Sequence, residues 1–217
     1  MTRERLVGAL SFGASGVAFL VSIGCLIAVD GPASPNILTT LASPNGREIF
    51  DIAVATGVVG AILYLIAATT LYIHLRDKDD LAMLVVLAFA IATAAVLIGV
   101  LAFEYVPVAV AQEGAREGFS TTDPAFHQLV VSAHKFADVG GWASIAMLAS
   151  TVLIVSVVLR GTRRWPALSI AGFAMTVLAI ALFLLDSSYA FLVAFGLWEI
   201  AIAAGFVITP LNRMQRP

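Results

Sequence analysis

Charged side chains are scarce in this sequence. Asp, Glu, Lys and Arg together make up 12% of its 217 residues, about half the share found in an ordinary soluble domain. Hydrophobic residues reach 60% and the mean hydropathy is +0.99, so the composition excludes a water-soluble fold. The net charge is −2 and no long basic tract is present, which gives no reason to expect a nucleic-acid partner.

Cysteine is nearly absent as well, since the chain has a single one, Cys25, inside its first apolar run. One thiol excludes a disulfide framework and a cluster of thiol metal ligands, so Cys25 is interpreted as a small packing residue. His74 lies at the opposite end of the predicted spans from His127 and His134, so no histidine pair faces across a haem. No Gly-rich phosphate loop, nucleophile elbow or HExxH motif occurs, and no cofactor is predicted.

Long apolar runs are what the sequence has instead. A helix needs about 20 mostly apolar residues to cross roughly 30 Å of hydrocarbon, and six stretches meet that requirement. We therefore expect one all-α domain over residues 1–217, a polytopic six-helix membrane bundle. The first run follows Arg3 and Arg5 but exceeds the length of a signal-peptide core, so it is interpreted as an uncleaved span. The predicted spans cover residues 6–29, 50–75, 81–103, 138–159, 166–185 and 189–209.

Basic residues are distributed unevenly between the two sides of these spans. Of the 12 Lys and Arg residues, only Arg47, Arg116 and Lys135 fall on the side away from the chain ends. Under the positive-inside rule both ends are therefore cytoplasmic. Small residues at four-residue spacing, such as Ala9 and Gly13, favour close helix packing. That packing suits a compact bundle, and equally a homodimer or a larger membrane complex.

The outer segment before the fourth span, residues 104–137, contains a helical pattern of its own. Asp123 and Pro124 form an N-cap and first-turn pair, from which a helix can run through the fourth span without another proline. Such a helix exceeds about 50 Å, which is too long for one crossing. We expect it to protrude, tilt or break, most readily at Gly140 and Gly141. Its outer part is amphipathic and is expected to lie along the outer leaflet or to rise from it.

One ionisable residue, Glu199, falls near the centre of the last span. An ionised side chain at that depth costs on the order of 2.5–3.5 kcal/mol even on a permissive insertion scale. Since no Lys or Arg lies at matching depth, the carboxyl is expected to keep its proton. It either links helices by a hydrogen bond or forms a ligand or proton site, and Trp198 beside it either packs or lines a pocket. The candidate hydrogen-bond partners at similar depth are Tyr64, Thr93, Ser150, Thr151 and Thr176.

A second candidate site lies on the amphipathic outer helix. His134 and Asp138 are four residues apart, a spacing that places two metal ligands on one helix face, so zinc binding is a hypothesis. A third ligand would come from Asp51, Glu104 or Asp186. The alternatives are a solvated helix face without a ligand and a pH-sensing pair of histidines, His127 and His134.

The last third of the chain carries two further patterns. Trp165 and Pro166 open the fifth span, and the last span has Trp198 and Glu199 followed by small residues through Gly205. With the chain length, the six spans and the long outer segment, these patterns resemble a family of bacterial six-helix membrane proteins known as domain of unknown function 4386. The resemblance covers nearly the whole chain and implies a bundle of the bacterial inner membrane without an assigned reaction. Where that family carries an arginine with an acidic neighbour at the start of span four, this chain has His134, Lys135 and Asp138.

Three functional hypotheses follow from these residues. The first is a non-catalytic ligand-binding, sensory or complex-associated membrane module, with a pocket near Glu199 for a small hydrophobic or lipid ligand. The second is a small transporter in which Glu199 couples proton movement to a substrate. The third is a metal-dependent intramembrane hydrolase that acts on a lipid through His134 and Asp138. Because the chain offers one isolated mid-membrane acid and no convergent set of titratable groups, the first hypothesis is favoured.

Overall fold

The computed structural model describes residues 3–30, 44–116, 124–162, 165–184 and 188–208, and in that part of the chain it is all-helical. Five helices are long and apolar enough to cross a membrane, and α6 supplies a shorter apolar stretch, Pro166–Leu182. The prediction of an all-α membrane protein is confirmed at this level. The described helices are α1 (Arg3–Asp30), α3 (Pro44–Leu75), α4 (Asp80–Arg116), α5 (Pro124–Thr162), α6 (Pro166–Leu184) and α7 (Ser188–Ile208).

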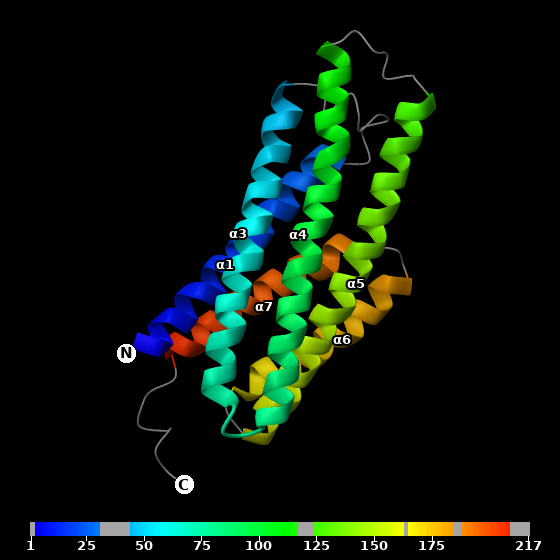
Figure 1. Cartoon of the computed structure of the whole chain (residues 1–217). Helices are drawn as coiled ribbons and strands as arrows, with labels where there is room; N and C mark the ends of the chain where they lie inside the picture. Colours follow the sequence, from blue (N-terminus) through cyan, green and yellow to red (C-terminus); the bar gives the residue numbers. More distant parts are fainter. Residues whose placement is uncertain (1–2, 31–43, 117–123, 163–164, 185–187, 209–217) are drawn as a thin grey trace.

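The helices form a closed ring of neighbours. Helix α1 packs against α3 and α7, α3 against α4, α4 against α5, α5 against α6, and α6 against α7. Figure 1 shows α1 and α7 inclined to α3, α4 and α5 and crossing behind them. Because α1 closes the ring onto α7, the first and last helices of the chain form one seam of the bundle.

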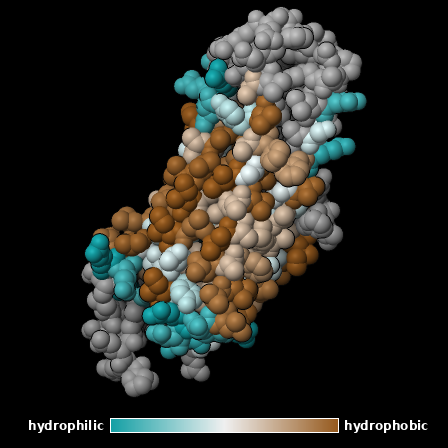
Figure 2. All heavy atoms as spheres, in the orientation of Figure 1, coloured by the Kyte–Doolittle hydropathy of each residue, from teal (hydrophilic) through white to brown (hydrophobic). Residues whose placement is uncertain are grey.

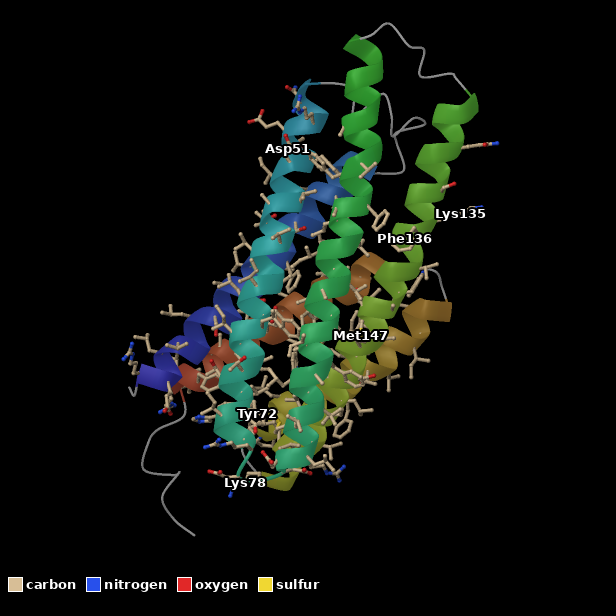
Figure 3. All side chains as sticks on the ribbon, viewed as in Figure 1. Asp51, Tyr72, Lys78, Lys135, Phe136 and Met147 are labelled. Carbon is tan, nitrogen blue, oxygen red and sulfur yellow. The ribbon has the colours of Figure 1, made fainter. Side chains whose placement is uncertain are left out.

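Four helix ends meet at one end of the bundle. The Arg5 guanidinium, at the start of α1, donates a hydrogen bond of 2.6 Å to the backbone oxygen of Phe206, near the end of α7. The Phe206 ring packs against His74 from the end of α3 and Trp165 from the turn that leads into α6. Helices α1 and α6 therefore start where α3 and α7 end. Figure 3 shows Tyr72 and Lys78 at this end, and Asp51 toward the opposite end.

The surface of the bundle carries large apolar side chains that no other helix covers. Figure 2 shows a broad apolar band between hydrophilic residues at the two ends. Leu10, Ile91 and Val177, which lie on three different helices, are all more than half exposed. An apolar surface of this extent is unfavourable in water and favourable in hydrocarbon, so the band marks the part of the bundle that faces lipid.

Helix α4 is longer than the sequence predicts. The apolar part of α4 ends at Phe103 as expected, but the helix continues to Arg116, a total of 37 residues or about 55 Å. Helix α5 starts at Pro124 and continues through the fourth span as predicted, and it runs unbroken for 39 residues; of the expected alternatives, a break at Gly140 and Gly141 does not occur. The outer part of α5 rises beside α4, and the rings of Phe103 and Phe136 lie 4.3 Å apart there.

Gly140 serves close packing of α5 on α4. A side-chain carbon added at Gly140 would lie 2.5 Å from Cγ2 of Val100, which is closer than side chains pack, whereas one added at Gly141 would meet nothing within 4 Å. Gly140 thus allows α5 to approach α4, and α5 stays helical through both glycines.

The α1–α7 seam is closer still, because backbone contacts backbone. A side-chain carbon added at Gly16 would lie 2.5 Å from the backbone oxygen of Gly196, and one added at Gly196 would lie 3.1 Å from that of Gly16. Backbone atoms do not move aside as a flexible side chain does. Glycine at both positions is therefore what allows α1 and α7 to cross at this distance.

Gly16→Ala should lower the free energy of unfolding by about 1–3 kcal/mol, because the added methyl group separates α1 from α7. Gly24→Ala is the matched control on the same helix, since its added carbon meets nothing within 4 Å. It should change stability by no more than about 1 kcal/mol, in the stabilising direction that alanine's helix propensity gives. Unfolding of both variants in mixed micelles, followed by circular dichroism, measures the difference, and equal stability would contradict the close seam.

Candidate functional site

Glu199 lies inside the bundle, and its side chain is fully buried. It is placed there by α7, which turns a row of aromatic and aliphatic side chains toward the other helices. A carbon added at Gly16 would lie 3.3 Å from Glu199 Cβ, so the glutamate emerges beside the α1–α7 crossing. The buried row of α7 consists of Phe191, Phe195, Trp198, Ile202 and Phe206.

The carboxyl group of Glu199 is held by the hydroxyl of Ser15. The Ser15 Oγ lies 3.1 Å from Oε1 and 3.0 Å from Oε2 of Glu199, and 3.2 Å from the backbone oxygen of Gly60. A hydroxyl has one proton, so it donates to one of these acceptors at a time. If Glu199 is neutral, its own proton is donated to Ser15 and the Ser15 proton to Gly60, which satisfies all three groups.

No residue in the described part of the chain forms an ion pair with Glu199. The ion pair that the described residues do form joins Arg47 to Asp51, on the first turns of α3. Removing an unpaired charge from water costs several kcal/mol or more, and one serine hydroxyl does not offset that. The neutral arrangement is therefore the one that suits this interior. It links three helices through one proton-bearing chain from Glu199 on α7, through Ser15 on α1, to Gly60 on α3.

Two more hydroxyl groups lie close to this chain. Tyr64 on α3 is buried, its ring packs edge-on against Phe195 at 5.7 Å, and its hydroxyl interacts with Thr151 on α5 and electrostatically with Glu199. Yet neither the Tyr64 nor the Thr151 hydroxyl has a partner at hydrogen-bond distance and angle. A buried polar group without such a partner costs about 1–3 kcal/mol. We name Ser15, Tyr64, Thr151 and Glu199 the central polar cluster.

Neither Thr93 nor Thr176 forms a hydrogen bond with the Glu199 carboxyl. Thr176 donates to the backbone oxygen of Gly172 in its own helix at 3.0 Å, so its hydroxyl is already satisfied on α6. Thr93 is fully buried without a hydrogen bond, but it belongs to α4, which packs against α3 and α5. Trp198 is buried, packs against Phe195 at 6.1 Å, and leaves its indole nitrogen without a hydrogen bond.

Ser15 is not among the partners that the sequence predicts for Glu199. A signal was present, because Ser11, Ser15 and Ser22 are spaced by four and seven residues and so share one face of α1. All three are buried. Serines on one side of an apolar span indicate a helix face that meets polar groups of its neighbours, which is where Glu199 finds its partner.

The proposed metal site lies outside the part of the structure that can be described. His134 and Asp138 belong to α5, but their side chains are not among those described, and neither are those of Glu104 and Asp186. The remaining candidate ligand, Asp51, pairs with Arg47 at 3.6 Å. Among the described residues no three potential ligands come together, which leaves the zinc hypothesis a prediction.

Comparison with known proteins adds no relative. No protein-family model matches the chain, and neither a curated protein nor a solved structure matches it. The resemblance to the six-helix family therefore stays a prediction, and no function is carried over from another protein.

Ser15→Ala should lower the free energy of unfolding by about 1–3 kcal/mol, because it leaves the Glu199 carboxyl buried without its partner. Ser22→Ala is the control. The Ser22 hydroxyl donates a hydrogen bond of 2.8 Å to the backbone oxygen of Ala53, and that oxygen keeps its own helical hydrogen bond when the hydroxyl is removed. It should cost about 0.6 kcal/mol, the average for such bonds in membranes. Denaturation in mixed micelles measures both, and an equal loss would mean that Ser15 is no more than a link between helices.

Proposed function

We propose that this protein is a non-catalytic ligand-binding module of the bacterial inner membrane, which spans the bilayer six times and binds a small hydrophobic or lipid ligand at the central polar cluster. The supporting observation is the combination of a fully buried Glu199, which forms no ion pair with the described residues, with the buried hydroxyl groups of Tyr64 and Thr151, which interact with each other but have no partner at full hydrogen-bond distance and angle. Buried polar groups are almost always satisfied, so a guest molecule explains the open positions.

The direction of the helices supports six spans with both ends in the cytoplasm. Helix α6 has 19 residues, about 28 Å, which is close to the thickness of the hydrocarbon core. The described basic residues at the Arg5 end of the bundle outnumber those at the other end, as the positive-inside rule requires of a cytoplasmic face. They are Arg3, Arg5, Arg76, Lys78 and Arg160 at the first end, against Arg47, Arg116 and Lys135 at the second.

The chemistry of the cluster defines the ligand. A neutral Glu199 both donates and accepts a hydrogen bond, and each unsatisfied hydroxyl can do the same. The surroundings are apolar, with Phe195 and Trp198 packed beside these groups. A fitting ligand therefore has one small hydrogen-bonding group on an otherwise apolar body.

Dicyclohexylcarbodiimide, an apolar reagent that adds to protonated carboxyl groups, should modify Glu199 in the folded protein in bilayers. Peptide mass spectrometry should find the adduct on the α7 peptide of the wild type and of Glu4→Gln, which removes an exposed acid, and none on that peptide of Glu199→Gln. If Glu199 is modified only after the protein has been unfolded, small hydrophobic molecules do not reach the cluster, and the proposal is wrong.

A proton-coupled transporter is the second candidate, and it is favoured by the two hydrogen-bond arrangements open to Ser15. Gain or loss of the Glu199 proton switches the Ser15 donor between Glu199 and Gly60, so protonation is coupled to the contact between α1 and α3. No described contact favours the lipid hydrolase, since the His134 and Asp138 side chains lie outside the described part.

The transporter predicts a proton flux across proteoliposomes that Glu199→Gln reduces at least tenfold, since the variant has no group that exchanges a proton at mid-membrane. A pH-sensitive dye inside the vesicles measures it, with protein-free vesicles as the baseline. Equal flux in wild type, Glu199→Gln and empty vesicles would leave the binding module as the function of the cluster.

A further inference from the structure

A groove opens between α5 and α6 at the basic end of the bundle, away from the central polar cluster. Its volume is about 440 Å³, within the range of small-molecule sites. One part of its lining is cationic and the rest is mostly apolar. The lining residues are Arg160 from α5 and Pro166, Ser169, Ile170 and Phe173 from α6.

The groove is preformed, because α5 and α6 are fixed to each other beside it. The Ser169 hydroxyl donates a buried hydrogen bond of 2.8 Å to the backbone oxygen of Ser156. One turn further along α6, a side chain added at Gly172 would overlap the Ser156 hydroxyl, so the two helices lie at their closest approach. The groove lies next to these contacts, at the end of the bundle where α5 ends and α6 begins.

Arg160 places a positive charge at this groove. Its side chain is exposed, and within the described part of the chain its guanidinium makes no hydrogen bond or ion pair. A guanidinium presents several N–H donors in a planar fork that matches the oxygens of a phosphate. It lies in the last turn of α5, where an apolar helix reaches the level of lipid head groups.

The rest of the groove suits a hydrocarbon chain. Ile170 is 70% exposed and Phe173 partly exposed, and both follow Pro166 along α6 into the apolar band. The groove therefore has a cation at the membrane surface and an apolar side that descends into the bilayer. A soluble anion would leave the apolar side unfilled, and a lipid without net negative charge would leave the charge of Arg160 uncompensated.

We propose that this groove is a binding site for an anionic phospholipid, whose phosphate pairs with Arg160 and whose acyl chain lies along Ile170 and Phe173. A cation near the membrane surface contributes about 1 kcal/mol to the binding of an anionic lipid, which corresponds to about a fivefold preference. The site is independent of the central polar cluster and of what that cluster binds.

The test is native mass spectrometry of the delipidated protein in detergent, with equimolar phosphatidylglycerol and phosphatidylcholine that carry the same acyl chains. In the wild type, the form with one bound phosphatidylglycerol should be about fivefold more abundant than the form with one bound phosphatidylcholine. Arg160→Gln should reduce the ratio to about one, whereas Arg160→Lys should keep part of it. Lys78→Gln is the control, because it removes an exposed charge at the same end of the bundle but outside the groove.

Three outcomes would overturn the site. A wild type without a preference means that Arg160 does not select an anionic head group. A preference that survives in Arg160→Gln places the lipid elsewhere. An equal loss in Lys78→Gln means that the net charge of the basic end, and not this groove, attracts the lipid.

Discussion

The burial of one carboxyl group constrains the rest of this bundle. In hydrocarbon no water is present to satisfy Glu199, so its partner has to come from another helix at the same depth. Ser15 fulfils that role only because α1 and α7 cross at Gly16 and Gly196, where backbone atoms touch. A larger residue at either glycine would push the hydroxyl out of reach. The glycine crossing and the hydrogen bond thus depend on each other, and together they close the ring of helices.

The same constraint explains which parts of the site could be predicted from sequence. Composition and hydropathy identify the spans, and the depth of Glu199 follows from its position in the last one. Depth alone does not say which face of which helix the carboxyl meets, and Thr93 and Thr176 are therefore reasonable candidates, although neither forms a hydrogen bond with it. Its actual partner, Ser15, depends on the pairing of the first helix with the last, and that pairing is not visible in any single segment.

The differences between the predicted and observed helices have a related cause. The sequence predicts the third span from apolar residues alone, and it gives Gly140 and Gly141 as the likeliest point for a break in the helix that follows Pro124. Where the apolar run of α4 ends, however, the helix packs against α5, through the contact of Phe103 with Phe136 and the close approach of Gly140 to Val100. Long-range packing of this kind can maintain a helix beyond the run that hydropathy defines. The amphipathic pattern that the sequence shows before the fourth span thus belongs to one face of the α4–α5 pair.

The packing also determines where a ligand would enter the central polar cluster. Separation of α1 from α7 would break the Ser15–Glu199 hydrogen bonds. The Glu199 carboxyl would then have no partner in hydrocarbon, at a cost of several kcal/mol. The contacts of α7 with α5 and α6 are sparser, and where α6 meets Gly205 of α7 they are made by the side chains of Trp165 and Leu168. Side chains change rotamer at lower cost than backbones separate. Entry from the lipid between α6 and α7 would therefore keep Glu199 paired with Ser15.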